Sequence, residues 1–347
     1  MSQRQSADDF GRDSGLISSA DALAILVNFE NHLTQYEQQI NELNVYPVPD
    51  CDTGSNVLAT VRAGLFGLGL RPDQFSSPES AALAAEKLNL SKSVQAFSLG
   101  ELFGEFAQNA ALSARGNSGA ILSEYFRGLS VSLSDSLTVA EPNSSTGEAD
   151  INAWYLALGS GASFAKAAVL NPVVGTAITV ADKIAEVQPC AQLFAYLGDV
   201  SHTARAALAQ TQNQLAQLAQ AGVVDAGAFA LVLFHETVFN YYTKQEIDLS
   251  SFAATNFTRG NLQYAGPKFE LTFLLTLEPD GNEVETEFQS ALKQLLSSAG
   301  ESLTIVGAAP KFKVHIHTDD IESVITAVEQ VGQVSQISTS ELSEFVG

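Results

Sequence analysis

Apolar residues recur at helical spacing through the first two thirds of the chain. Between 18 and 44 they fall three or four positions apart, at Leu23, Leu26, Phe29, Leu33, Tyr36, Ile40 and Leu43. This spacing places them on one face of a long helix. Similar patterns predict helices over 55–68, 77–88, 99–114, 119–129, 151–170, 176–186, 201–221 and 226–242. Residues 130–150 are rich in Ser, Thr and Asp and predict a mobile loop between two of these helices.

The pattern changes after about residue 246. Aromatic and β-branched residues become dense over 268–277, 302–308 and 311–318, which predicts three strands. Helical patterns over 284–299 and 321–332 complete a β-α-β-β-α order, typical of a small α+β domain. We therefore expect a multidomain protein of mixed α and α+β class. Its parts are a polar tail (1–17), an all-α domain (18–247), a linker (248–263) and a small α+β domain (264–347).

The composition narrows the classes of partner. The 347 residues carry 39 Asp and Glu against 17 Lys and Arg, a formal net charge of −22. Such a surface repels nucleic acid and anionic membranes, so we expect neither as a partner. There is no apolar run of about 18 residues, so we expect no membrane span. The polar start lacks a signal-peptide core and two cysteines give no disulfide framework, so we expect a cytoplasmic protein.

The segment 44–56, with the sequence NVYPVPDCDTGSN, carries the strongest chemical signal. Its two prolines fix φ and favour an extended approach to Asp50 and Asp52. In an extended segment residues two apart point the same way, so the two carboxylates can converge on one point. The Thr-Gly-Ser turn that follows can cap the next helix. Paired carboxylates beside a helix N-terminus suit a phosphate bridged to Mg²⁺, although an acidic turn that only caps a helix has the same residues.

A second candidate is the segment 113–119, with the sequence SARGNSG, just before a predicted helix. Its small residues would expose backbone N–H groups at the helix start, and Arg115 adds a positive fork for phosphate oxygens. The alternative is a glycine-rich turn with a solvated arginine.

Two further turns are weaker signals. Residues 171–176 (NPVVGT) place Thr176 where it can cap a helix or contact a phosphate. Asp225, in the sequence GVVDAG, opens an apolar helix and is explained most simply as its N-cap.

The end of one predicted strand carries a His-x-His pair. His315 and His317 share one strand face, so both can bind one transition metal. Glu270, on another predicted strand, can supply a third ligand. Two polar residues on an exposed strand face would give the same pattern.

Together these motifs resemble one family. The order NxxPxPDxDTGxN, ARGNSG, PVxGT and GVVDAG is similar to the ATP-binding domain of dihydroxyacetone kinases, the DhaL-type domain. The version that begins LNVYPVPD, with the C-terminal segment ending KVHIHT, resembles the catalytic subunit of fatty acid kinases, including its middle domain. The resemblance runs from about residue 18 to the end of the chain.

The resemblance implies an antiparallel helical barrel that holds ATP at one end. It implies that Asp50 and Asp52 ligate Mg²⁺, with Asn44 a weaker partner, and that Arg115 neutralises charge during phosphoryl transfer. It also implies a carrier that binds fatty acids and presents the acyl carboxylate, and a metal in the middle domain, with Zn²⁺ as the candidate, on Glu270, His315 and His317. The other implied nucleotide contacts are Thr53, Gly54, Ser55, Asn56, Gly116, Asn117, Ser118, Gly119, Thr176 and Asp225.

Several positions depart from the family pattern. Cys51 replaces the glycine of PDGDTG, and we expect strain there if that position needs a positive φ. Val174 replaces a carboxylate, and Glu270 stands at the family's metal-binding cysteine. The family's DAGGQGL is DAGAFAL here, which loses two glycines, and Phe229 is expected to crowd the nucleotide. The family has a further C-terminal domain, which we expect to be missing here because the sequence ends at Gly347.

The leading functional hypothesis is an ATP- and Mg²⁺-dependent kinase that phosphorylates a fatty acid carboxylate to an acyl phosphate. A carboxylate is already ionised at neutral pH, so the reaction needs positioning and charge neutralisation rather than a general base. Two alternatives stay open: a non-catalytic nucleotide-binding or regulatory protein, and a kinase of a small hydroxy-ketone such as dihydroxyacetone. The sequence allows a homodimer but does not fix the oligomeric state.

Overall fold

The structure is a computed structural model that describes residues 15–71, 97–139, 148–254, 264–277 and 285–342. The expected helix over 77–88 lies outside these residues. None of the described helices is both long and apolar enough to cross a membrane.

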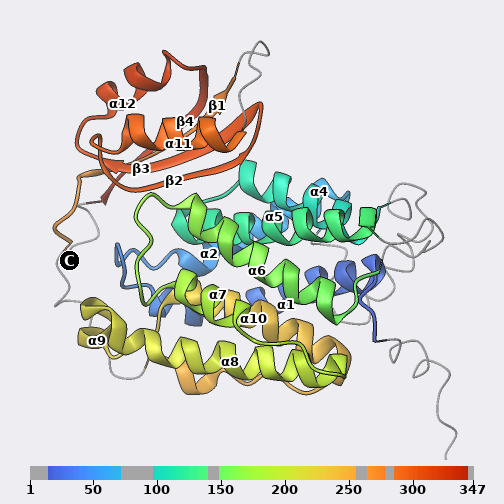
Figure 1. Cartoon of the computed structure of the whole chain (residues 1–347). Helices are drawn as coiled ribbons and strands as arrows, with labels where there is room; N and C mark the ends of the chain where they lie inside the picture. Colours follow the sequence, from blue (N-terminus) through green and yellow to red (C-terminus); the bar gives the residue numbers. More distant parts are fainter. Residues whose placement is uncertain (1–14, 72–96, 140–147, 255–263, 278–284, 343–347) are drawn as a thin grey trace, which may run out of the picture.

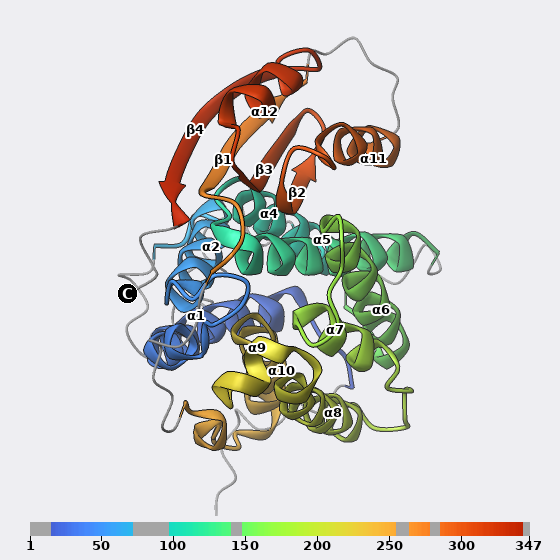
Figure 2. The same cartoon turned by 90° about the vertical axis from the view of Figure 1, so that its left-hand side faces the viewer.

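The N-terminal part is a closed ring of antiparallel helices (Figures 1 and 2). Neighbours around the ring are α1, α2, α4, α5, α6, α7, α8 and α10, and α10 returns to pack against α1. This arrangement is the helical barrel that the resemblance implied. The helices are α1 (Ser19–Leu43), α2 (Thr53–Gly67), α4 (Leu99–Leu112), α5 (Gly116–Val139), α6 (Ile151–Ala168), α7 (Ala177–Ala185), α8 (Leu193–Gln214), α9 (Ala216–Ala221) and α10 (Ala226–Thr243).

Local sequence explains where several of these helices begin. Ser18 and Asp21 form a capping box at the start of α1, and Ser98 and Glu101 form another at α4. Asp150 caps α6 through a hydrogen bond from the backbone of Ala153.

Aromatic side chains fill the interior of the ring. Phe126 lies at the centre, with its ring centroid 4.9 Å from that of Phe234 and 5.0 Å from that of Phe106. Trp154, expected in the core, is 1% exposed. The barrel is therefore a packed core, and the chemistry must lie at its rim.

The small domain is an antiparallel sheet with strand order β2-β3-β1-β4, covered on one face by two helices (Figure 1). Its elements are β1 (Phe269–Thr276), α11 (Glu285–Leu296), β2 (Glu301–Ala308), β3 (Lys311–Thr318), α12 (Ile321–Val328) and β4 (Gln333–Glu341). Alternate residues of β3, including Phe312, Val314 and Ile316, join the core with α11 and α12. The intervening residues of β3, Lys313, His315 and His317, lie on the opposite face.

The final strand, β4, was not expected. The helix predicted over 321–332 ends at Val328, and the chain then pairs with β1 along Gln333–Glu341. Most residues of β4 are exposed and polar, because the strand lies at the sheet edge and has no buried face. Without an apolar alternation, its backbone pairing left no signal in the sequence.

Two helix boundaries also differ from the prediction. Helix α5 continues to Val139 through the first part of the expected loop over 130–150, because Leu133 is buried and Ser130 Oγ donates to Gly100 O of α4. Helix α8 begins at Leu193 rather than at 201, and a break at Leu215 separates it from α9.

The two domains are joined by backbone contacts. Val169, just after α6, forms an antiparallel bridge with Thr304 of β2, and Leu170 N donates to Leu303 O at 3.1 Å. Farther along β2, Gly307 N donates to the buried Glu124 Oε1 of α5 at 2.9 Å. The sheet face that carries the two histidines is thereby held against the barrel rim.

Candidate functional site

The loop before α2 brings Asp50 and Asp52 together, but not by the extended geometry expected. Cys51 has φ of 63°, in the left-handed region, so the chain turns sharply between the two carboxylates. Burial, the charge of Asp52 and a hydrogen bond with Asp52 raise the pKa of Asp50 to about 8. Cys51 therefore stands at a position whose backbone conformation favours glycine, the residue that the family has there.

The start of α2 is capped from α1 and not by Thr53 or Ser55. Asn44 Oδ1 accepts hydrogen bonds from Asp52 N, Thr53 N and Thr53 Oγ1 at 2.8–3.1 Å. Asn41 Oδ1 accepts from the backbone of Gly54 and Ser55 at 2.7 and 3.2 Å. These side chains occupy the free N–H groups of the first turn, so Asn44 shapes the loop and α2 offers a phosphate few free donors.

The start of α5 is different. Gly116 has φ of 58°, and no side chain in the described ranges accepts a hydrogen bond from the first-turn N–H groups of Gly116, Asn117 or Ser118. Asn117 Oδ1 is buried without a hydrogen-bond partner. Arg115 is exposed beside this turn. Open N–H groups at the start of a long helix, with an arginine next to them, suit an anion.

The two histidines and Glu270 form a compact cluster on the sheet. One ligand atom from each of Glu270, His315 and His317 lies within 4.8 Å of the others. Glu270 pairs with His317 across β1 and β3, which explains their meeting. Both His315 ring nitrogens are buried without hydrogen-bond partners, and burial with the neighbouring His317 and Lys313 lowers the pKa of His315 well below its usual value. A neutral imidazole with an unsatisfied nitrogen is the form that binds a metal.

The carboxylate pair and the histidine cluster line the same small cavity, of about 40 Å³, here called the metal cavity. Burial, together with the charge of Asp52, raises the pKa of Glu270 to about 7, and Glu270 in turn contributes to the raised pKa of Asp50. Three carboxylates that repel one another are stabilised by a cation. The metal cavity also includes Asn44, Thr53, Asn56, Arg115, Gly116, Asn117 and Ser118.

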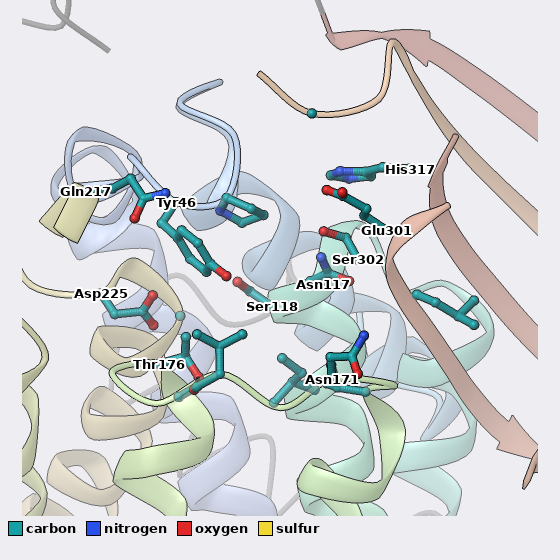
Figure 3. Close-up of a pocket in the computed structure, with 18 of the residues that line it drawn as sticks. Tyr46, Asn117, Ser118, Asn171, Thr176, Gln217, Asp225, Glu301, Ser302 and His317 are labelled. Carbon is teal, nitrogen blue, oxygen red and sulfur yellow. Dashed lines mark hydrogen bonds between the residues drawn. The ribbon is translucent and has the colours of Figure 1, made fainter. Parts of the chain in front are cut away.

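A cavity of about 580 Å³ adjoins the metal cavity and lies between the two domains, here called the interdomain cavity (Figure 3). Tyr46, Asn117, Ser118 and His317 line both cavities, so the two lie side by side. Apolar side chains such as Ile121, Val173, Ile178 and Leu303 form part of the wall. Polar groups reach into it from the barrel and from β2, among them Asn171, Thr176, Gln217, Asp225 and Glu301 (Figure 3).

Asp225 has both a structural position and a place in the wall. Its Oδ2 accepts from Ala228 N at 2.7 Å, so it is the N-cap of α10 as expected. Burial raises the pKa of Asp225 to about 6, although backbone N–H groups of Ala228, Ala177 and Gly227 oppose that rise. Thr176 stands at the N-cap position of α7, but its hydroxyl donates to Val173 O and does not cap the helix.

Some predicted residues lie away from both cavities. Ser55 Oγ donates to Glu37 at 2.6 Å and faces α1, and Gly54 and Gly119 are close-packing positions. Phe229 is fully buried against Tyr36 and does not crowd the interdomain cavity. Val174 is 65% exposed and points away from the wall.

Sequence reasoning missed several wall residues. Tyr46 follows Asn44 and directly precedes the first of the two prolines, so its place in the motif could have identified it as a wall residue. Tyr264 Oη lies 3.3 Å from His317 Nδ1, and Glu301 and Ser302 come from the start of β2. These residues come from the second domain, and no local pattern indicated that it would form a wall.

Comparison with known proteins gives two family matches. Residues 47–240 match the family described as DAK2 domain, and residues 266–346 match the FakA-like middle domain of fatty acid kinase. Both families are kinase-related. Similar proteins include an uncharacterized protein of Staphylococcus saprophyticus, 26% identical over 92% of this chain and 54% of its own length. An uncharacterized protein of Staphylococcus aureus is 26% identical over 92% of this chain and 55% of its own. The chain thus spans about half the length of these relatives.

Proposed function

We propose, from the premise that this chain belongs to the DAK2-domain family and carries a FakA-like middle domain, that it transfers the terminal phosphoryl group of ATP to a carboxylate. The observation that supports this most is that the two cavities are adjacent and share wall residues. One offers carboxylates for a hard cation, and the other has the volume and the mixed apolar and polar wall that a nucleoside requires.

Within this proposal each part of the site has a role. Asp50 and Asp52 hold Mg²⁺, which would supply charge neutralisation for the phosphate chain. The open first turn of α5 and Arg115 bind phosphate oxygens, while the wall around Ile121, Val173 and Asp225 encloses the nucleoside. Asn44 and Asn41 fix the loop that carries the two carboxylates.

The proposed acceptor is a fatty acid presented by a separate binding protein. Such an acceptor is an anion at neutral pH, so the site needs no general base. The test is ATP turnover with and without a fatty-acid-binding carrier. Acyl phosphate formed only with the carrier supports the proposal; ATP binding without any phosphoryl transfer supports the non-catalytic alternative, and turnover with dihydroxyacetone supports the hydroxy-ketone alternative.

We also propose Zn²⁺ for Glu270, His315 and His317. The donor set is two imidazoles and one carboxylate, and the unsatisfied nitrogens of His315 fit a metal. Elemental analysis of untagged protein should find about one zinc per chain, lost in the His315→Ala/His317→Ala double variant. Equal zinc in the wild type and the double variant would show that these residues are not zinc ligands. The matched control replaces the isolated, solvent-exposed His202 by Ala.

A further inference from the structure

Two cations from different domains lie next to each other beside the metal cavity. Arg115 comes from the turn before α5, and Lys313 comes from β3. No hydrogen bond or ion pair joins either side chain's charged group to another residue in the described part of the chain. In a protein with a net charge of −22, two neighbouring cations that no carboxylate neutralises need an explanation.

Packing between the two domains brings Lys313 close to Arg115. Val306 of β2 is the cross-strand partner of Lys313, and it is buried against Ala114 and Ala120, which flank the Arg115 turn. Lys313 is half-buried rather than solvated. Burial and the nearby Arg115 lower the pKa of Lys313. The packing of Val306 against Ala114 and Ala120 therefore keeps Lys313 near Arg115.

Strand β3 orders the parts of the site along one line. His317 lines both cavities, His315 lines only the metal cavity, and Lys313 follows two residues farther on the same face. Two residues along a strand span about 6.6 Å, so Lys313 lies roughly 13 Å along β3 from the residue that borders the interdomain cavity. The nucleoside, the metal and the cation pair thus succeed one another along β3.

The interdomain cavity and the surroundings of Arg115 and Lys313 differ in charge, as phosphoryl transfer requires. The wall of the interdomain cavity, as described, contains Asp225 and Glu301 but no lysine or arginine. The metal cavity is lined by Arg115, which the interdomain cavity is not, and Lys313 lies near Arg115. In transfer of a phosphoryl group the acceptor approaches opposite the leaving group, so an acceptor must lie on the side away from the nucleoside.

We infer that Lys313, beside the phosphate-binding Arg115, binds the anionic acceptor, a carboxylate, on the side of the metal cavity away from the nucleoside. This inference rests on the proposed function and deepens it by naming the acceptor subsite. A hydroxyl acceptor would gain little from two cations, whereas a carboxylate approaching a phosphate chain needs its own charge neutralised.

The reverse reaction tests the subsite without a carrier. Octanoyl phosphate and Mg·ADP are supplied: a β-phosphate oxygen of ADP attacks phosphorus, the bond between phosphorus and the acyl oxygen breaks, and octanoate leaves as the anion. ATP formation is measured for the wild type, Lys313→Met, Lys313→Arg and Lys311→Met. Lys311 lies on the same strand face but is exposed, and it serves as the matched control.

We expect Lys313→Met to lower kcat/KM for octanoyl phosphate about 30-fold or more, with the Kd for Mg·ADP changed less than twofold by calorimetry. Lys313→Arg should recover much of the activity, and Lys311→Met should match the wild type. Unchanged kinetics in a folded Lys313→Met protein would overturn the inference, and so would a loss confined to Mg·ADP affinity, which would make Lys313 a nucleotide-phosphate ligand. A wild type that forms no ATP from free octanoyl phosphate is assayed again, with its variants, using octanoyl phosphate bound to the fatty-acid-binding carrier. Binding of Mg·ADP without ATP formation in either assay would instead contradict the proposed function.

Discussion

Helices α2 and α5 both begin at the metal cavity, yet their first turns differ. The N–H groups of α2 are occupied by Asn41 and Asn44, and the loop before it delivers two carboxylates. The N–H groups of α5 have no capping side chain in the part of the chain described, and Arg115 precedes them. One helix start thus has the groups that suit a cation and the other has the groups that suit an anion. Both helix starts contain small polar residues and look alike in sequence. They differ because Asn41 and Asn44 supply capping side chains to α2, whereas no described side chain caps α5.

The largest expected effect comes from removing the cation site before α2. Asp50→Asn should weaken Mg·ATP binding or turnover about 10²-fold, close to 3 kcal/mol. The metal-free protein should keep its stability, since a buried carboxylate that repels Asp52 is removed. Calorimetry with Mg·ATP measures the affinity, and Asp199→Asn on α8, which lines neither cavity, is the control. Unchanged affinity would show that α2 does not serve a cation.

The cap supplied by α1 should matter next. Asn44→Ala removes an acceptor shared by three donors and should lower the free energy of unfolding by about 2 kcal/mol. Denaturant unfolding measures this loss. Asn213→Ala, at an exposed site on α8, is the control. A loss in Asn44→Ala no larger than that in Asn213→Ala would argue against the capping role.

At the open start of α5, an added negative charge should lower nucleotide affinity without lowering stability. Asn117→Asp places a carboxylate among free N–H groups, which favours the helix but repels phosphate. We expect nucleotide affinity to fall about tenfold with no loss of melting temperature. Asn213→Asp adds the same charge at an exposed site and should leave affinity unchanged. A parallel loss of stability and affinity would mean that the turn is structural only.

The dependence of stability on pH should reveal the carboxylate cluster. The pKa of Asp50 is raised to about 8 and that of Glu270 to about 7, so the folded metal-free protein binds more protons than the unfolded chain between about pH 4 and 8. These groups therefore make stability fall as pH rises through that window. Thermal unfolding without metal should show a shallower fall in Asp50→Asn, and added Mg²⁺ should stabilise the wild type more at pH 8 than at pH 6. Equal Mg²⁺ shifts at both pH values would contradict this account.

The smallest effect is expected at Cys51. Cys51 has φ of 63°, a conformation that costs about 1 kcal/mol for a residue with a Cβ. A glycine would relieve that strain, but its greater conformational freedom in the unfolded chain offsets part of the gain in stability. Cys51→Gly should raise the free energy of unfolding by about 0.5 kcal/mol and keep or improve Mg·ATP binding. Cys190→Gly, at the exposed second cysteine, separates this effect from loss of a thiol. Abolished binding in Cys51→Gly would give the thiol a role in the site.

The sequence by itself determined the barrel helices, because each has an apolar stripe or a local cap, as in α1 and α4. It also predicted residues that the fold brings together, since Asp50, Asp52, Arg115, His315 and His317 all line the metal cavity. Only the tertiary structure decided β4, which has no buried face, and the length of α5, which depends on contacts with α4. Only it decided that Asn41 and Asn44 cap α2, that β2 walls the interdomain cavity, and that Lys313 lies near Arg115. Each of these depends on contact between segments far apart in the chain, and local spacing carries no information about such contacts.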